Sequence, residues 1–450
     1  MTATAAARPP RGRRLRLRRP GADVGLAVAG GLVCALASPP IDVVPAVFVG
    51  LALLAAVALR APTARRAFGL GLVWATAGGI VGMRFVPEVV DRYVDWGAAL
   101  CAVALVLLAV AQGLAWGLAA AGANVLARHV PGPLAFGAGV AVASFVPGLF
   151  TWTPAALLMP RPELVQLAEV VGERGVSLLV GVLAGLLATL RVRPVVAALV
   201  VLVALDLGGA ARMDAVASRP GGTLSVALVD HAATHRVDPT PDQRRAELAR
   251  LHALSRAADA RGAELVVWPE GSFPYPQPRP LVPLPPGERS PLTPGAQAPR
   301  LVGVRTYEDT AEGRRRFNSA TLVHPDGHAE PPYDKVELMW FGETMGPLET
   351  LMPRGSALTA GDAPRPVLLS RRSGAALETL RLAILTCYED MQTGYGRRAG
   401  REVRPALLVG MSNNSWFANT VATAWQERLS KMRAIELRTD LVRAVNGGVS

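Results

Sequence analysis

The chain has 450 residues, of which 51% are hydrophobic and 18% charged, and its mean hydropathy is +0.30. These averages are too apolar for an ordinary soluble enzyme. The net charge of +12 does not indicate a nucleic-acid partner, because many basic residues lie in the tail at residues 8–19 and in short loops between apolar segments. The sequence has no Cys/His cluster with metal-ligand spacing and no glycine-rich nucleotide motif, so we expect no metal and no cofactor.

Residues 1–21 form a basic tail, which we expect to be cytoplasmic, and residues 22–212 are predominantly apolar, with most of their charges in short loops between apolar segments. Within this stretch each apolar segment is near the length needed to cross about 30 Å of hydrocarbon. The segments lie at about 24–40, 43–59, 67–86, 96–122, 133–150, 176–190 and 194–210. We therefore predict a transmembrane helical bundle of about seven helices.

The charges of the loops indicate how this bundle is oriented. Seven arginines lie in residues 8–19, and alternate loops are also basic, which places the N-terminus in the cytoplasm. After seven crossings, residues 220–450 would then lie on the extracytoplasmic side. A cleaved signal peptide ending near residues 35–38 is the alternative, but the alternation of loop charge needs a retained first helix.

The polar half, residues 220–450, alternates strand and helix patterns. A buried strand at 224–229 precedes a capping box at Thr240 with proline at the first helical position, and a second strand follows at 263–268. The alternation repeats with strands at 380–386 and 406–409. This order predicts an α/β domain with reactive groups at the carboxyl ends of its strands.

Residues 271–299 interrupt this alternation with ten prolines. No helix or central strand tolerates this content, so we expect a long loop directly after Glu270. It is either a solvent-exposed insertion or a lid that dips into the bilayer. A hairpin over 317–323, with its turn at residues 326–327, then leads to Lys335.

Three reactive side chains follow or close apolar runs: Glu270, Lys335 and Cys387. Each signal is weak alone, since a single cysteine at a strand end is usually an inert small hydrophobe. A free thiol is only slightly ionised at neutral pH and needs a base or a nearby cation to act as a nucleophile. We expect Glu270 to be that base and Lys335 to lower the thiol pKa and stabilise an oxyanion. Attack on an ester would give a thioester that an amine can resolve.

The order Glu, Lys, Cys, with Cys-Tyr-Glu at 387–389 and Ser-Asn-Asn-Ser-Trp-Phe at 412–417, resembles the nitrilase superfamily. With a helical bundle in front, the chain resembles the apolipoprotein N-acyltransferase family, the membrane-anchored branch. The motifs at 335–343 and 432–436 carry that closer resemblance. It implies an α-helical membrane bundle followed by an α/β nitrilase-like domain, an αββα sandwich.

This resemblance implies a function in lipoprotein maturation. A phospholipid would give its fatty-acyl chain to Cys387, and the N-terminal amine of a diacylglyceryl lipoprotein would receive it. The enzyme would lie in the bacterial inner (cytoplasmic) membrane with its catalytic domain on the periplasmic side. Residues matching supporting positions are Glu343, Tyr388 and Glu389, and those matching substrate-binding positions are Phe341, Asn413 and Trp416.

The chain also departs from the family pattern. Asp230-His231 stands where the family carries Gln-Gly-Asn, Trp340 replaces a proline, and Gln426-Glu427 replaces Gln-His. Relatives continue past residue 450 with further sheet and a last membrane helix, so we expect this chain to be truncated at its C-terminus. Two alternative functions stay open: a membrane-anchored amidase or nitrilase-type hydrolase, and a degenerate, non-catalytic nitrilase-fold protein.

Overall fold

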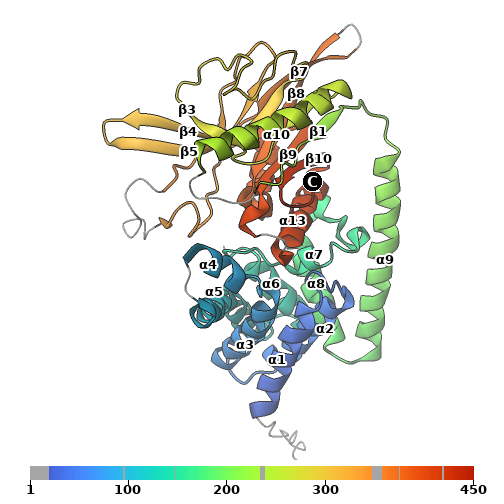
Figure 1. Cartoon of the computed structure of the whole chain (residues 1–450). Helices are drawn as coiled ribbons and strands as arrows, with labels where there is room; N and C mark the ends of the chain where they lie inside the picture. The colour runs from blue at the N-terminus through green and yellow to red at the C-terminus, as the bar shows by residue number, and fades with distance from the viewer. Residues whose placement is uncertain are drawn as a thin grey trace, which may run out of the picture.

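The computed structural model describes residues 20–94, 97–146, 148–233, 239–346, 357–373, 376–417 and 420–450. A bundle of helices forms one end of the molecule and two β-sheets form the other, as Figure 1 shows. Helix α9 runs along the side of the molecule and carries the chain from the bundle to the sheets. The short tail before residue 20 lies outside the described residues.

Apolar helices occupy all seven segments that the sequence predicted to be membrane-crossing. They are α1 Pro20–Ala35, α2 Pro45–Ala58, α3 Ala64–Gly82, α5 Gly97–Leu126, α6 Gly132–Ala143, α8 Ala168–Leu187 and α9 Val192–Ala217. Between them lie the short helices α4 Val86–Val94 and α7 Pro154–Leu157 and a 3-10 turn, η1 Pro162–Val165.

Not all of these helices are long enough to span a bilayer. In the described part of the chain, α5, α8 and α9 are long and apolar enough, and α3 with α4, bent by 60° at their junction, gives a fourth candidate. Helices α1, α2 and α6 are apolar but shorter. The helical half therefore fits a membrane protein, whereas the count of seven crossings and the domain limits at 22–212 and 220–450 stay predictions.

Glycines allow the bundle helices to approach closely. A Cβ on Gly31 of α1 would lie 2.1 Å from the Trp74 carbonyl oxygen of α3, and one on Gly71 of α3 would lie 2.4 Å from the Trp116 carbonyl oxygen of α5. Neither position accommodates a larger residue without movement of the backbone. The small residues in the apolar sequence thus set the helix spacing, as they do in membrane bundles generally.

The polar half contains two sheets packed face to face. The first has the order β1-β2-β4-β5-β6, with β3 paired to β4, and the second has the order β10-β9-β8-β7. The strands of the first sheet are β1 Val226–Leu228, β2 Leu265–Val267, β3 Phe273–Pro278, β4 Arg300–Thr310, β5 Gly313–Val323 and β6 Tyr333–Asp334. Those of the second are β7 Val367–Ser373, β8 Ala376–Thr386, β9 Leu407–Asn413 and β10 Leu441–Asn446.

Strand β3 corrects the prediction that the proline-rich stretch 271–299 is only a loop. Phe273 and, after a shift of register, Gln277 and Pro278 pair with β4 in parallel. Three prolines fit because β3 lies off the main path of the sheet and pairs with a single strand. Proline is not tolerated in a strand that is hydrogen-bonded on both sides, but it is tolerated in a strand with a free edge.

Helices cover the outer face of each sheet and complete the predicted αββα sandwich. Between the sheets, Leu265 and Leu322 of the first share a core with Leu382 and Val409 of the second. Helix α10, Pro241–Ala260, begins at the predicted Thr240 capping box and covers the first sheet. The second sheet carries α11 Tyr388–Met391, α12 Thr393–Val403 and α13 Val421–Leu437.

Helix α13 lies between the sandwich and the bundle (Figure 1). Its Trp425, Leu429 and Met432 belong to the same apolar core as the bundle helices. The Trp425 indole donates a hydrogen bond of 2.8 Å to the Thr151 carbonyl oxygen. The two halves are thus packed against each other through side chains and are not merely tethered by α9.

Candidate active site

The three predicted reactive residues converge at one end of the sandwich. Glu270 follows β2, Lys335 follows β6 and Cys387 follows β8. Lys335 Nζ lies 3.5 Å from Glu270 Oε1. The charges of Glu270 and Lys335 both act on the Cys387 thiol. A carboxylate, an ammonium group and a thiol therefore share one site, although they are separated by more than a hundred residues of chain.

Cys387 occupies a strained turn between β8 and α11. Its φ of 50° and ψ of −106° place a non-glycine residue in a sparsely populated region of backbone conformation. Its backbone N–H donates to the Met411 carbonyl oxygen at 2.8 Å, which ties the turn to β9. The residue as a whole is partly exposed.

The resting thiol of Cys387 is neutral. Burial raises its pKa well above the ordinary value, and the charge of Glu270 raises it further, whereas Lys335 lowers it. Lys335 by itself lowers the pKa of the thiol, as the sequence predicts, but the opposite effect of burial is larger. The thiol proton therefore has to leave as the sulfur attacks, and Glu270 is the nearby carboxylate that can take it.

Lys335 is a buried cation held by two carboxylates. Its side chain is 1% exposed, and Nζ lies 2.7 Å from Glu343 Oε2 in addition to its contact with Glu270. Burial alone would lower the pKa of Lys335, but the charges of Glu343 and Glu270 raise it above the ordinary value. Conversely, burial opposes the ionisation of Glu343, but Lys335 lowers the pKa of that carboxyl. The Lys335 side chain is therefore an ammonium group at neutral pH.

Asn318 joins the two carboxylates, and sequence reasoning missed it. Its Nδ2 donates to Glu270 Oε1 at 2.6 Å and to Glu343 Oε1 at 2.8 Å. The second oxygen of Glu270 accepts from the backbone N–H of Asn413 at 3.0 Å. The only signal in the sequence is an amide within the apolar strand 317–323, where a buried polar group requires partners.

Glu389 supports the site from behind. Its buried carboxylate accepts hydrogen bonds of 2.7 Å from the Tyr333 hydroxyl and from the backbone N–H groups of Val336 and Thr386. Burial raises the pKa of Glu389 to about 7, against the opposing effect of these donors. Because Val336 follows Lys335 and Thr386 precedes Cys387, the carboxylate fixes the segments that carry the ammonium and the thiol.

The other predicted site residues have different surroundings. Tyr388 donates from its hydroxyl to the Gly148 carbonyl oxygen at 3.1 Å, so it points to the helical half. Phe341 is 63% exposed on the loop between Lys335 and Glu343. Asn413 accepts a hydrogen bond from the Ser415 backbone N–H through Oδ1. The side chain of Trp416 lies outside what the structure describes, so substrate binding by these residues stays a prediction.

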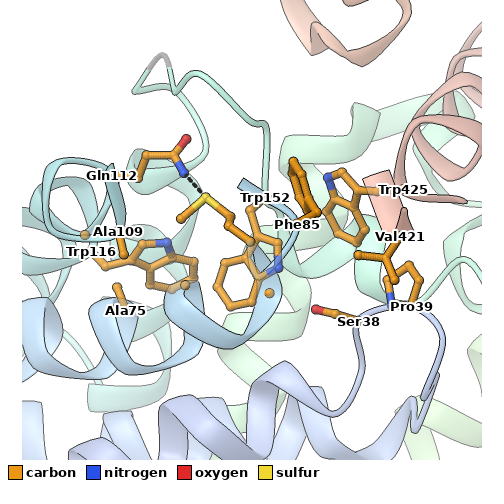
Figure 2. Close-up of a pocket in the computed structure, with 14 residues that line it drawn as sticks. Ser38, Pro39, Ala75, Phe85, Ala109, Gln112, Trp116, Trp152, Val421 and Trp425 are labelled. Carbon is orange, nitrogen blue, oxygen red and sulfur yellow. Dashed lines mark hydrogen bonds between the residues drawn. The ribbon is translucent and has the colours of Figure 1, made fainter. Parts of the chain in front are cut away.

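An aromatic cavity of about 60 Å³ lies between the bundle and α13. Figure 2 shows Trp116 and Trp152 on the bundle side and Trp425 with Val421 on the α13 side, with Phe85 between them. Gln112 at its edge donates to the Met83 sulfur at 2.8 Å. Gln426, the next residue after Trp425, donates to the Cys387 carbonyl oxygen at 3.2 Å. Helix α13 therefore both lines this cavity and contacts the turn that carries the thiol.

The groups in this site suit nucleophilic acyl transfer. A thiol with a neighbouring carboxylate and a buried ammonium can attack a carbonyl, move the proton and stabilise the resulting oxyanion. In the described segments, no group of three or more His, Cys, Asp or Glu side chains is arranged to hold a metal ion.

Comparison with protein families agrees with this architecture. The family described as "Apolipoprotein N-acyltransferase N-terminal domain" matches residues 30–186, and the family "Carbon-nitrogen hydrolase" matches residues 226–449. Fold and site together define a membrane-associated enzyme of the carbon–nitrogen hydrolase type.

Individual relatives specify the family further. The chain is 28% identical to an apolipoprotein N-acyltransferase of Geobacter metallireducens, over 96% of this chain and 85% of that protein. It is 29% identical to one of Azotobacter vinelandii, over 94% of this chain and 84% of that protein. Among solved structures, Saccharomyces cerevisiae Nit3, a member of the nitrilase superfamily, matches 50% of this chain and 75% of its own at 14% identity with a TM-score of 0.34. The chain belongs to the apolipoprotein N-acyltransferase family.

Proposed function

We propose that this protein moves a fatty-acyl chain from a phospholipid, through a thioester on Cys387, to the N-terminal amine of a diacylglyceryl lipoprotein. Its family membership supports this reaction. The single observation that carries it is the meeting of Cys387 with Glu270 and Lys335 at the end of the sandwich that packs on the apolar bundle. A site packed against an apolar bundle suits a substrate that resides in the membrane, such as a lipid ester.

In the first half-reaction, Glu270 takes the thiol proton while Cys387 Sγ attacks the ester carbonyl carbon. The negative charge that develops on the carbonyl oxygen is stabilised by the ammonium group of Lys335, which is already charged and buried. The carbon–oxygen bond of the ester then breaks. The leaving lysophospholipid alkoxide takes the proton from Glu270, and the acyl chain remains on sulfur as a thioester.

In the second half-reaction, the amine of the lipoprotein attacks the thioester carbonyl. Glu270, which is ionised again, accepts a proton from the attacking nitrogen, and the carbon–sulfur bond breaks as the amide forms. The departing sulfur recovers a proton from Glu270, so the free enzyme is restored. Glu343 and Asn318 hold Lys335 and Glu270 in place throughout the cycle.

The location that suits this reaction is the bacterial inner membrane, with residues 220–450 on the periplasmic side. The basic tail at residues 8–19 and the charges of the loops support this orientation. The apolar and aromatic lining of the small cavity between Trp152 and Trp425 suits contact with a small apolar group of the lipid substrate.

Mass spectrometry of the purified membrane protein tests the proposal. After incubation with phospholipid, a fatty-acyl adduct is expected on Cys387, and addition of a diacylated lipopeptide should transfer it to the peptide amine. Loss of the adduct to water alone would instead indicate a hydrolase. Absence of any adduct would indicate a protein that keeps the fold without turnover.

A further inference from the structure

Helix α13 holds the backbone of the nucleophile. Gln426 of α13 is 3% exposed, and its Nε2 lies 3.2 Å from the Cys387 carbonyl oxygen and 2.8 Å from the Ser412 hydroxyl oxygen. Ser412 lies on β9, the strand whose Met411 carbonyl accepts the Cys387 N–H. One amide side chain thus binds the strained turn and the neighbouring strand together.

The same face of α13 binds Asp390, three residues after the nucleophile. Gln426 Nε2 lies 3.3 and 3.4 Å from the two Asp390 oxygens, and the Ser430 hydroxyl, one helical turn further, donates to Asp390 Oδ2 at 2.6 Å. The side chains of Ser430 and Asp390 are fully buried. Both ends of the segment 387–390 are therefore attached to α13.

Two helical turns beyond Gln426, the same helix is attached to the bundle. Arg433 forms an ion pair with Glu173 of α8, and both side chains are 0% exposed. Glu173 also accepts a hydrogen bond of 2.8 Å from the Thr393 hydroxyl, and its backbone N–H donates to Glu436 Oε1 at 2.7 Å. A buried ion pair of this kind is costly to break, so it fixes α13 on α8.

We propose that Gln426 is a positioning residue that sets the orientation of Cys387, and that α13 links this orientation to the docking of the catalytic half on its own bundle. Only the assay of lipid adduct formation depends on the proposed function. Residues 426 and 433 are seven positions apart, which places them on one face of the helix. The ion pair between Arg433 and Glu173 therefore determines the position of the Gln426 amide relative to the turn that carries Cys387.

The variant Gln426→Met tests the first part, because methionine keeps the length of the side chain and removes its hydrogen-bond donors. The full chain in phospholipid nanodiscs is assayed for the rate of adduct formation on Cys387 at increasing phospholipid, and for its thermal unfolding midpoint. We expect the maximal rate to fall about 10²-fold, the cost of a small misplacement of a reacting group, with unchanged half-saturation and midpoint. Ser412→Ala, which removes one partner of Gln426, should give a smaller fall in the same rate.

Glu427→Gln is the matched control, since Glu427 is the next residue of the helix and pairs with Lys431, whose side chain is 60% exposed. It should leave the maximal rate unchanged. Glu173→Gln tests the link to the bundle: it touches none of the reacting groups, yet it should lower the maximal rate. Should Gln426→Met not fold, Ser412→Ala decides the first part.

A wild-type maximal rate in Gln426→Met or Ser412→Ala would overturn the positioning role, as would a fall accompanied by an equal loss of thermal stability. A wild-type rate in Glu173→Gln would overturn the link to the bundle. Alkylation of Cys387 by iodoacetamide needs no lipid, and its rate should also fall in Gln426→Met. If the unmodified protein forms no lipid adduct, the proposed function fails, and alkylation still decides the role of Gln426.

Discussion

Glu343→Gln separates the electrostatic roles of the buried charges. The change removes the carboxylate that lies 2.7 Å from Lys335 Nζ and leaves that ammonium group with Glu270 alone, 3.5 Å away. Breaking a buried ion pair costs about 3–5 kcal/mol. Because Glu270 remains, we expect the lower end, about 3 kcal/mol, which corresponds to a fall of about 6–12 °C in the unfolding midpoint for a domain of this size.

The same change should make the Cys387 thiol more acidic. The charge of Glu343 is one of the groups that raise the pKa of Cys387. Its removal should therefore lower the pH midpoint for alkylation of Cys387, even as the protein becomes less stable. Differential scanning calorimetry and the pH profile of iodoacetamide labelling measure the two effects.

Glu427→Gln is again the control, because its ion pair with Lys431 is at the surface and is worth less than about 1 kcal/mol. An unchanged unfolding midpoint in Glu343→Gln, or an alkylation midpoint that moves upward, would show that Glu343 does not act on Lys335 and Cys387 as the geometry requires.

Four further outcomes are expected. Cys387→Ala and Glu270→Gln should abolish the acyl adduct in mass spectra, and normal labelling of the alanine variant would overturn the assignment of the nucleophile. Lys335→Ala should slow adduct formation by about 10²–10³, the usual loss for an oxyanion donor; a rate equal to wild type would remove Lys335 from the mechanism. Burial raises the pKa of Glu389 from 4.5 to about 7, so the folded state favours the neutral form and the protein should lose stability as the pH rises from about 4.5 to 7. Glu389→Gln should make the unfolding midpoint depend less steeply on pH over this range, and an unchanged pH dependence would contradict the argument. Ala75→Leu, which fills part of the aromatic cavity, should slow acylation by phospholipid but not alkylation by iodoacetamide. An acylation rate equal to that of the wild type would show that the lipid does not use the cavity.

Local sequence patterns predicted most of the elements correctly. The capping box at Thr240 marks the start of α10, and apolar runs at 263–268 and 380–386 became β2 and the end of β8. Each signal depends only on residues close together in the chain: periodic apolar residues, caps and prolines. The order of Glu270, Lys335 and Cys387 was likewise visible because each closes or follows such a run.

Other features depend on contacts between distant parts of the chain. The ion pair of Glu173 with Arg433 joins residues 260 positions apart, and no local pattern pairs them. The bridging role of Asn318 is equally invisible, because an amide in a strand does not indicate which carboxylates it will meet.

The sequence by itself determined which segments are apolar, which are strands or helices, and which side chains could react. Only the tertiary structure decided the state of those side chains, because a pKa depends on burial and on charges brought close by folding. Cys387 thus rests as a neutral thiol despite the nearby Lys335, and Lys335 stays charged despite its burial. Both outcomes follow from the balance of desolvation and Coulomb attraction in three dimensions, which residue order does not contain.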